Sequence, residues 1–341
     1  MKSPSPRLLV TADDRTGALE IGGVVANREF SVPVGITPVQ ANCSVVDVDT
    51  RQVSANLAYE RMYDLGRFPS SYRCHKMDSG LRGNWPVEIK TLLDLGQAVG
   101  IIPGYPEAGR RCIDGVVYID DVPLLESPFG ADPLTAPCSN RPIEVLEDAG
   151  VTSGDFVLFN ADTEAEVLSD VQRVFKEGRV LVSPTGPIGA YARHVFPNLT
   201  PQKVETRKPL LIFCGSLNAT SRLQITQLGL TVFDIEDDLN ETSPITVLAT
   251  PEATQTISIS QAQDMGQRTA DRIKELESHF ETLIVIGGDT SAAYIRDQTV
   301  DVIGTVATGI PVAIFQDSVL ITKGGGIGNP DTLVEICQSA D

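Results

Sequence analysis

Aspartate and arginine recur together in short polar segments of the N-terminal half, each directly after an apolar run. Residues 8–19 read LLVTADDRTGAL, so two adjacent carboxylates follow the run LLVT. The polar residues at the ends of such runs are Asp13, Asp14, Asp49, Arg51, Asp78, Arg82, Arg110 and Arg111. A guanidinium group binds a carboxylate through paired hydrogen bonds, and an aspartate accepts from hydroxyls or acts as base toward one. The pattern predicts a site for a polyhydroxy acid.

A simpler interpretation exists for each of these residues taken alone. An aspartate after a strand often caps the next helix, so Asp13 or Asp14 could serve only as an N-cap. A single arginine is usually solvated. Because four segments of one half share the pattern, we favour one common site over four coincidences.

The C-terminal half has glycine- and hydroxyl-rich segments after its apolar runs. They are CGSLN (214–218), GGDTS (287–291) and KGGGIGNP (323–330). Backbone N–H groups left accessible by glycine, together with a helix N-terminus, bind phosphate, and Lys323 would add a positive charge. No GxxxxGK[ST] segment is present, and GGGIG near the chain's end is not a GxGxxG fingerprint. A single glycine run is more often a turn, but three at successive strand ends favour an anion site.

The elements that must position these segments alternate between strand and helix. Strands are predicted at 8–11, 32–37, 43–49, 98–103, 156–162, 180–184, 209–216, 230–235, 282–289 and 310–315. Helical patterns cover 54–68, 164–178, 221–229 and 258–280. Several apolar runs are continuous, as in parallel strands covered on both faces. The pattern predicts an α/β fold in which ligands bind at the carboxyl ends of the strands.

A polar, proline-containing stretch at 196–209 suggests a boundary between two domains, residues 1–205 and 206–341. A second irregular stretch, 123–142, contains five prolines and no clear period. An irregular stretch of this length inside a compact domain is often a lid or a substrate loop.

The bulk properties narrow the function further. A net charge of −18 disfavours nucleic acid or an anionic membrane as the main partner. The sequence has no apolar run long enough for a transmembrane helix and no signal-peptide pattern, so we expect a cytoplasmic protein. The six cysteines and three histidines lack zinc-site spacing. We expect the cysteines to be buried free thiols.

Several motifs resemble those of the four-carbon acid sugar kinases, ATP-dependent enzymes of carbohydrate metabolism acting on threonate, erythronate and 3-oxotetronate. In the N-terminal half they are ADDRTGA (12–18), KMDSGLRGN (76–84), PGYPEAGR (103–110), DGVVY (114–118) and Asp-Pro-Leu (132–134). In the C-terminal half they are CGSLNATS (214–221), GGDTSAAY (287–294) and TKGGGIGNPDTL (322–333). The resemblance covers residues 8–337. It departs from the family at His75, Gly80, Arg111 and Asn218.

The resemblance implies a transferase with two α/β domains, each with a mostly parallel sheet flanked by helices, and an active site in the interdomain cleft. The N-terminal domain would bind the sugar acid, and the C-terminal domain would be nucleotide-binding, with ATP and Mg²⁺. The implied catalytic residues are Asp14 and Asp78, either of which could be the base. The implied acid-binding residues are Asp13, Arg51, Lys76, Ser79, Arg82 and Arg110. The implied ATP-binding residues are Ser216, Gly287, Gly288, Asp289, Thr290, Lys323, Gly325 and Gly328.

No metal ligand is assigned, although Asp289 is an alternative contact for Mg²⁺. The expected partners are the sugar acid and ATP, without nucleic acid or membrane, and a homodimer stays open. Two rivals remain beside the kinase. One is a non-catalytic sugar-acid sensor derived from the same family. The other is a dinucleotide-dependent dehydrogenase, which the missing GxGxxG segment disfavours.

Overall fold

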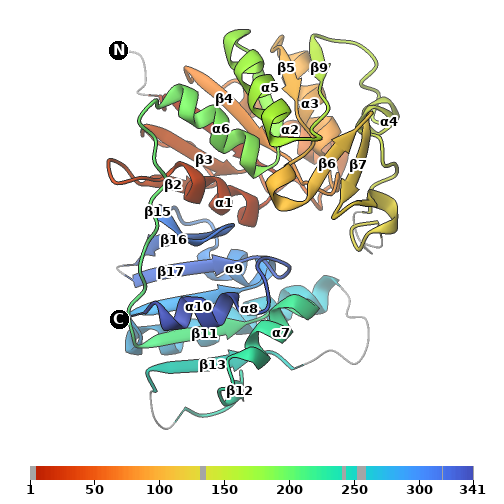
Figure 1. Ribbon diagram of the computed structural model, residues 1–341. Helices are drawn as coiled ribbons and strands as arrows, with labels where there is room; N and C mark the ends of the chain where they lie inside the picture. Colours follow the sequence, from red (N-terminus) through yellow and green to blue (C-terminus); the bar gives the residue numbers. More distant parts are fainter. Residues whose placement is uncertain (1–4, 131–135, 240–242, 252–258, 317, 341) are drawn as a thin grey trace. The chain divides into compact units, whose positions relative to one another are not determined.

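The computed structural model describes residues 5–130, 136–239, 243–251, 259–316 and 318–340 (Figure 1). The chain divides into two compact units, Met1–Val25 with Pro33–Leu199 (unit 1) and Ala26–Val32 with Thr200–Asp341 (unit 2). The expected boundary near residue 206 and the expected site in an interdomain cleft stay predictions.

Unit 1 contains a parallel sheet in which neighbouring strands follow the order β2-β3-β1-β4-β10-β5-β9. The strands are β1 (Leu8–Ala12), β2 (Val32–Gly35), β3 (Cys43–Asp47), β4 (Tyr72–Lys76), β5 (Val99–Ile101), β9 (Phe156–Leu158) and β10 (Val180–Ser183). The central strands β1, β3 and β10 are buried along their whole length, because helices cover both faces of the sheet.

The helices of unit 1 form two groups. One group is α1 (Arg15–Val25), α5 (Glu164–Lys176) and α6 (Thr185–Val195), in which α6 packs on both α1 and α5 (Figure 1). The other is α2 (Ala55–Gly66) packed on α3 (Trp85–Asp94). A capping box of Thr163 and Glu166 begins α5, and Ser54 caps α2.

A small antiparallel sheet and short helices lie between β5 and β9 along the chain. The sheet is β6 (Arg110–Ile113), β7 (Val116–Ile119) and β8 (Val122–Pro123). The helices are η1 (Pro106–Ala108), η2 (Leu124–Glu126) and α4 (Pro142–Asp148). The irregular stretch expected at 123–142 thus begins with β8 and η2, and its Asp-Pro-Leu segment lies outside the described residues.

The strands of unit 2 are mostly parallel, and neighbouring strands follow the order β12-β13-β11-β14-β17-β16-β15. The strands are β11 (Leu210–Cys214), β12 (Val232–Asp234), β13 (Ile245–Ala249), β14 (Thr282–Ile286), β15 (Val300–Ala307), β16 (Ile310–Phe315) and β17 (Ser318–Lys323). Strand β16 is antiparallel to both β15 and β17, whereas β12, β13, β11, β14 and β17 are parallel.

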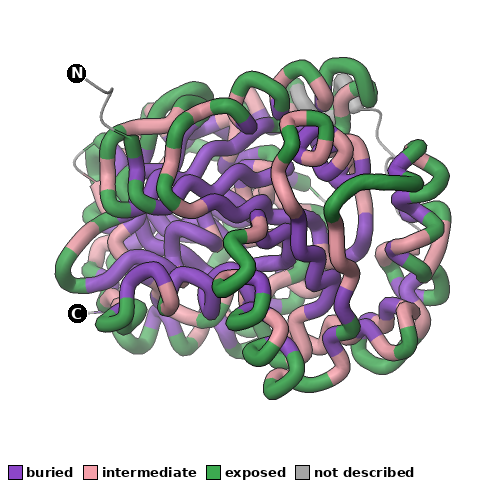
Figure 2. Tube along the Cα trace, turned by 90° about the horizontal axis from the view of Figure 1, so that it is seen from above, coloured by how far each residue is buried: buried purple, intermediate pink, exposed green. Residues whose placement is uncertain are grey.

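The helices of unit 2 pack in two pairs, α7 (Ala219–Gln227) with α10 (Thr332–Gln338) and α8 (Ile259–Leu276) with α9 (Gly288–Ile295). The short helix η3 (Glu277–His279) follows α8. Ile225 of α7 and Leu333 and Ile336 of α10 join strand residues in one buried apolar cluster. Strands β11 and β14 are buried along their whole length. Buried stretches of the chain are purple in Figure 2.

The α/β class with mostly parallel sheets flanked by helices is confirmed. The predicted strands and helices all correspond to observed elements within a few residues, apart from Ser258, which lies outside the described residues. Sequence reasoning missed β4, whose residues include Arg73, His75 and Lys76, because buried charged side chains interrupt the apolar pattern. It also missed β13, β17 and the small strands β6, β7 and β8. It missed β15 as well, whose residues alternate between buried and less buried positions.

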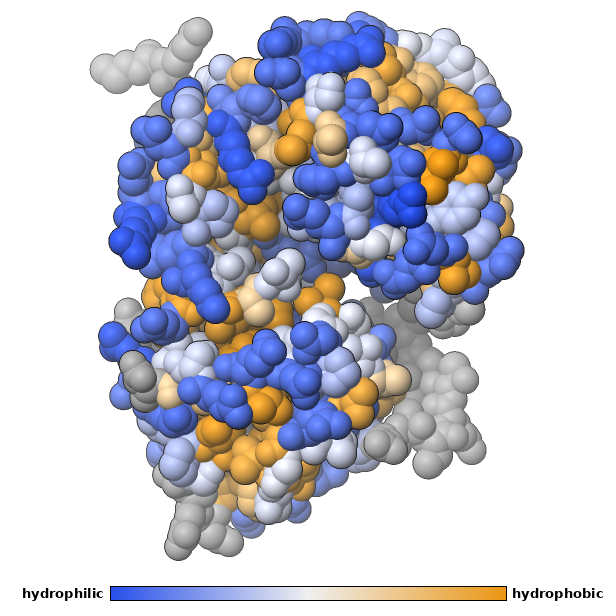
Figure 3. Space-filling model, in the orientation of Figure 1, coloured by the Kyte–Doolittle hydropathy of each residue, from blue (hydrophilic) through white to orange (hydrophobic). Residues whose placement is uncertain are grey.

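The visible surface is mostly polar (Figure 3), and the cysteines are unpaired. The face of the molecule seen in Figure 3 is largely polar, with scattered hydrophobic side chains. None of the helices in the described residues is both long and apolar enough to span a membrane. The six cysteines are free thiols, but Cys138 is exposed, so the expectation of burial was wrong for that residue.

Candidate functional site

The carboxyl ends of four neighbouring strands of unit 1 lie level with one another. Ala12 at the end of β1 pairs with Asp47 of β3 and Lys76 of β4, and Lys76 pairs with Ser183 of β10. Side chains that follow these residues therefore meet at one edge of the sheet, as predicted. Asp13, Asp14, Arg51, Lys76, Asp78 and Arg82 lie together there, and we call these residues the Asp–Arg cluster.

Arg51 lies at the centre of the cluster. Its Nε donates to Asp13 Oδ2 at 2.7 Å, and its Nη1 donates to Asp14 Oδ2 at 2.7 Å. Its Nη2 lies 3.4 Å from Asp78 Oδ1. Burial alone would lower the pKa of Arg51, but the neighbouring carboxylates raise it well above its ordinary value. Arg51 is therefore permanently charged and binds carboxylates from two separate loops.

Asp78 is held on both oxygens by Arg82. Nε of Arg82 donates to Oδ2 and Nη2 donates to Oδ1, each at 2.8 Å. Asp78 Oδ2 also accepts from the backbone N–H of Gly80 at 3.0 Å. Burial would raise the pKa of Asp78, but Arg51 and Arg82 outweigh it and hold the pKa below its usual range. Asp78 is thus a weak base whose position is fixed.

Lys76 and Asp13 supply a second ion pair. Lys76 Nζ lies 3.7 Å from Asp13 Oδ1, and the lysine is 6% exposed. Burial would lower the pKa of Lys76, but Asp13 and Asp14 raise it. A Cβ at Gly17 would lie 2.6 Å from Lys76 Nζ, so the glycine of ADDRTGA makes room for the ammonium group. Asp13 Oδ1 is buried and has no hydrogen-bond donor in the described structure, so one acceptor of the cluster is unsatisfied.

Asp14 has two roles at once. Its Oδ1 accepts from the backbone N–H of Gly17 at 2.9 Å, which makes it the N-cap of α1, and its Oδ2 pairs with Arg51. The capping alternative considered from the sequence is therefore correct for Asp14, but it is not the whole account. Its side chain is 25% exposed, against 0% for Asp13 and 7% for Asp78, so Asp14 is the most accessible carboxylate of the cluster.

Two other predicted residues lie at the margin of the cluster. Ser79 follows Asp78 in the same loop and is partly exposed. Arg110 begins β6, and its Cζ lies 5.7 Å from the ring centroid of Phe129. Arg82 Cζ lies 4.8 Å from the same centroid. Phe129 therefore connects Arg110 to the cluster.

Two carboxylates near the strand ends were missed by sequence reasoning. Glu20 on α1 accepts from Thr185 Oγ1 at 3.1 Å, and burial raises its pKa although Lys76 opposes this. Asp47 pairs with Arg15 Nε at 2.9 Å, and burial raises its pKa to about 6. Both flank the ADDRTGA segment in space. Glu20 lies in α1, the helix that begins within the ADDRTGA segment. Its place one to two turns into that helix was the sequence signal that could have identified it.

His75 belongs to the sheet rather than to the cluster. It is fully buried, with Nε2 2.7 Å from Glu88 Oε2 and Nδ1 2.8 Å from Thr11 Oγ1. Its two ring nitrogens are thus occupied within the fold. This departure from the family pattern has a structural role.

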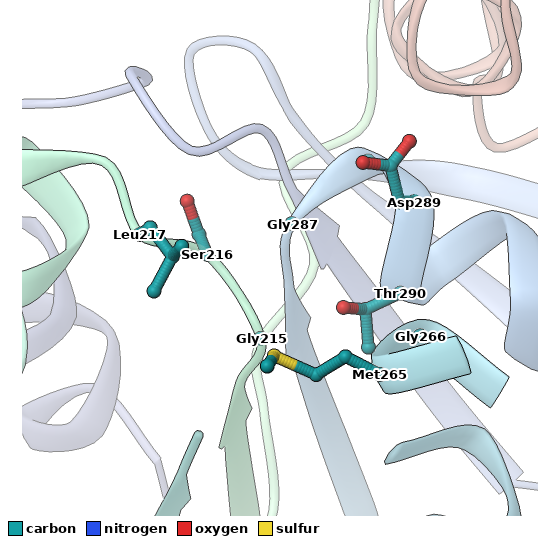
Figure 4. A pocket seen from close by; sticks show the side chains of 9 residues that line it. Gly215, Ser216, Leu217, Met265, Gly266, Gly287, Asp289 and Thr290 are labelled. Atoms are coloured by element: carbon teal, nitrogen blue, oxygen red, sulfur yellow. The ribbon is translucent and has the colours of Figure 1, made fainter. Parts of the chain in front are cut away.

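Unit 2 contains a pocket of about 200 Å³ at the ends of β11 and β14. Ser216 and Leu217 lie on one side and Asp289 and Thr290 on the other, with the Met265 side chain reaching toward Gly215 (Figure 4). Of the predicted nucleotide-binding residues, five line it: Ser216, Gly287, Gly288, Asp289 and Thr290. Gly215, Leu217, Met265 and Gly266 also line it but had not been selected.

Glycine allows the loops of this pocket to approach closely. A Cβ at Gly215 would overlap Thr290 Oγ1, and a Cβ at Gly325 would overlap Ser216 Oγ. Gly287, at φ 122°, comes directly before α9. The three predicted glycine segments therefore contact one another, and the N-terminus of α9 lies at the pocket.

Lys323 lies at the end of β17, next to the end of β14. Its Nζ donates to Gly324 O at 3.1 Å and to Ser221 Oγ at 3.3 Å, and the residue is 1% exposed. Burial lowers its pKa to about 8. Gly328, at φ 87°, is in the same loop and contacts Thr332 of α10. Lys323 and Gly325 thus adjoin the Ser216 loop, whereas Gly328 belongs to the turn before α10.

The described residues contain no group of three or more acidic, histidine or cysteine side chains able to hold a metal ion. A magnesium ion that is bound mainly by phosphate oxygens needs only one or two carboxylates from the protein. Asp289 with the hydroxyl of Thr290 offers oxygen donors of that kind at the pocket. The donor set therefore fits a nucleotide-bound Mg²⁺ better than a resident ion.

Comparisons with known proteins identify a family and named relatives. A family model described as a sugar-binding N-terminal domain matches residues 8–182, which include the whole Asp–Arg cluster. A D-threonate kinase of Salmonella typhimurium is 23% identical over 412 residues, covering 96% of this chain and 97% of that protein. A 3-oxo-tetronate kinase of Brucella melitensis is 24% identical over 410 residues, covering 94% and 93%.

The fold is also found among solved structures. The crystal structure of a Haemophilus influenzae protein, from a domain family of unknown function, matches with a TM-score of 0.70 and 18% identity. The match covers 97% of this chain and 99% of that one. The chain therefore belongs to the family with the sugar-binding N-terminal domain, and its predicted kinship with the four-carbon acid sugar kinases is confirmed.

Proposed function

We propose that this protein is an ATP-dependent kinase that phosphorylates a hydroxyl group of a small sugar acid, most simply one of four carbons. The observation that carries the proposal is the Asp–Arg cluster, in which three carboxylates face three cationic side chains at one edge of a parallel sheet. Relatives named as sugar-acid kinases cover nearly the whole chain and support it.

Arg110 is the group we assign to the substrate carboxylate. Arg51 and Arg82 are already bonded to aspartates of the cluster, whereas Arg110 donates to the backbone carbonyl of Ala108 and its carboxylate partner, Asp120 Oδ1, is 3.9 Å away. The guanidinium group of Arg110 is therefore the one best able to exchange its partner for a ligand. Asp13 Oδ1, which lacks a donor, would accept from a substrate hydroxyl.

Asp14 is our choice for the general base. A base works best when its pKa lies near the working pH, and the pKa of Asp78 is held below its usual range. Both oxygens of Asp78 are also bonded to the guanidinium group of Arg82, whereas only one oxygen of Asp14 is bonded to a cation. Asp14 is the most exposed of the three carboxylates and can reach a bound hydroxyl with the least rearrangement. Asp78 would then position Arg51 and Arg82.

The pocket of unit 2 would hold ATP. Backbone N–H groups of the glycine loops and the N-terminus of α9 suit phosphate oxygens, and Lys323 would add charge. Mg²⁺, held by Asp289 and the phosphates, would neutralise charge during transfer. The protein's share of the reaction is then to orient the acid, to take its hydroxyl proton and to exclude water. We expect it to act in the cytoplasm.

The test is release of ADP from Mg-ATP in a coupled assay across a panel of four-carbon and longer sugar acids. We expect one acid to be phosphorylated, and Asp14→Asn to lower kcat by a factor of roughly 10²–10⁴. Asparagine is an equally good N-cap, so the variant should fold normally. Asp49→Asn is the matched control, because Asp49 also follows a strand, is exposed and has the positive φ that asparagine tolerates.

The outcomes separate the proposals. Retained activity of Asp14→Asn would remove Asp14 from the role of base. Binding of an acid and of ATP by calorimetry, without ADP release, would indicate the sensor alternative instead. Absence of ATP binding would contradict the assignment of the unit 2 pocket.

A further inference from the structure

Phe129 occupies an unusual position beside the Asp–Arg cluster. It comes from the irregular stretch after β8, yet its ring lies against the α-carbon of Gly80 in the Asp78 loop. A Cβ at Gly80 would overlap Cδ1 of this ring. The ring thus fills the space that a side chain at position 80 would occupy.

Two guanidinium groups lie close to the same ring. The Cζ atoms of Arg82 and Arg110 are 4.8 Å and 5.7 Å from its centroid, distances typical of cation–π contacts. Arg82 belongs to the cluster, and Arg110 comes from the small antiparallel sheet. Phe129 is therefore the side chain through which the two arginines are connected.

The turn that carries Phe129 is well fixed within the fold. Ser127 is 5% exposed, and its Oγ donates to Leu124 O at 2.6 Å and accepts from Phe129 N at 3.2 Å. A Cβ at Gly130 would overlap the backbone of Leu125, so the turn is compact. Leu125 N in turn donates to Asn140 Oδ1 at 2.6 Å. These bonds hold the ring in place before any ligand binds.

We propose that Phe129 is the specificity-determining residue of the acid subsite. Its ring positions the guanidinium group of Arg110 for the substrate carboxylate and closes the space between Arg110 and the Asp78 loop. The distance from the carboxylate to the reacting hydroxyl is thereby limited, and acids longer than the natural one are excluded. Gly80 is required because only glycine leaves room for the ring. The inference deepens the proposed function and rests on its acid-binding part.

The test measures binding of four-, five- and six-carbon sugar acids by calorimetry to the full chain. In Phe129→Ala we expect the affinity for the longest acids, relative to the four-carbon acid, to rise at least tenfold. Gly80→Ala should have the same effect, because its new methyl group displaces the ring. Phe196→Ala is the matched control, since Phe196 carries a guanidinium contact with Arg7 before β1, at the opposite edge of the sheet. It should leave the ratio unchanged.

A double variant tests the contact between the two residues. If a methyl group at position 80 overlaps the Phe129 ring, Gly80→Ala lowers the midpoint of thermal unfolding when Phe129 is present. The same substitution should leave the midpoint unchanged when Phe129 is already replaced by alanine. An unchanged affinity ratio in Phe129→Ala, or additive effects of the two substitutions, would overturn the inference. Acid binding with the expected ratios but no ADP release would refute the kinase while leaving the inference intact. Failure of every acid to bind would refute both.

Discussion

Replacing Arg51 by methionine would remove the cation at the centre of the Asp–Arg cluster. The substitution keeps a long apolar stem but deletes the hydrogen bonds to Asp13 and Asp14 and the contact with Asp78. A Cβ at Gly83 would lie 3.1 Å from the Arg51 α-carbon, so the backbone there is closely packed and should not relax. The variant therefore isolates the effect of lost charge.

The loss of folding stability in Arg51→Met follows from the burial of the ion pairs. Removing one partner of a buried ion pair destabilises a protein by about 3–5 kcal/mol, because the other charge is left uncompensated. Asp13 keeps Lys76 as a neighbour, Asp78 keeps Arg82, and Asp14 is 25% exposed. These partners reduce the loss, so we expect about 3 kcal/mol at neutral pH, the lower end of that range.

The loss should depend on pH in a defined direction. The pKa of Asp78 is lower in the folded protein than its ordinary value of 3.8. Such a group stabilises the fold above its unfolded pKa and loses this effect as pH falls through the folded pKa. In Arg51→Met the pKa is lowered less. The difference between wild type and variant is therefore largest at neutral pH and shrinks below pH 3.8.

Denaturation by urea, followed by tryptophan fluorescence, measures this loss. Trp85 is the single tryptophan of the chain, is fully buried, and lies in α3 of unit 1, so its signal reports on that unit. Arg61→Met is the control, because Arg61 pairs with the exposed Asp49 and such pairs contribute less than about 1 kcal/mol. Equal losses in the two variants, or a loss independent of pH, would refute the reasoning.

Two predictions concern the pocket of unit 2. Lys323→Met should weaken ATP binding at least tenfold, since a hydrogen bond to a charged group contributes about 1.5–3 kcal/mol. In the wild type, the affinity for ATP should fall as pH rises through about 8, because Lys323 loses its proton there. Lys323→Met should not show this pH dependence. Calorimetry at several pH values measures both. Gly215→Ala should abolish ATP binding, because its methyl group overlaps Thr290 Oγ1, without changing the fluorescence of Trp85. Gly326→Ala is its control, as the nearest atom to a Cβ there is 3.6 Å away; ATP binding equal in both variants would contradict the pocket assignment.

The sequence predicted where the strands end and which polar side chains would meet there, because parallel strands bring their carboxyl ends to one edge. It predicted Asp13, Arg51 and Asp78 as neighbours for that reason, although they are far apart along the chain. Glu20 was not predicted, since its approach to Thr185 depends on how α1 packs against α6. Phe129 was beyond prediction, because the turn that carries it has no period and its contact with Gly80 is purely tertiary.

The pocket residues divide in the same way. Ser216 and Gly287 lie within two residues of the end of a strand and Thr290 lies in the first turn of α9, and glycine after an apolar run was signal enough. Met265 and Gly266 lie within α8, a helix between two strands, where the sequence shows only an amphipathic pattern. Pocket residues in the middle of a helix, unlike those in the first turn after a strand, can be identified only when the packing of the helix is known.

The segment Ala26–Val32 belongs to unit 2, although unit 1 precedes and follows it along the chain, and this limits where the chain can be cut into independent fragments. The chain leaves unit 1 after Val25, returns at Pro33 and leaves again after Leu199. The backbone of Ala26 accepts a hydrogen bond from Gln202 N at 3.2 Å, which ties the early segment to the later one. A fragment that starts at residue 200 would lack a piece of its own unit. No single cut therefore yields two complete units, because a cut after residue 199 leaves unit 1 whole but gives a C-terminal product that lacks Ala26–Val32.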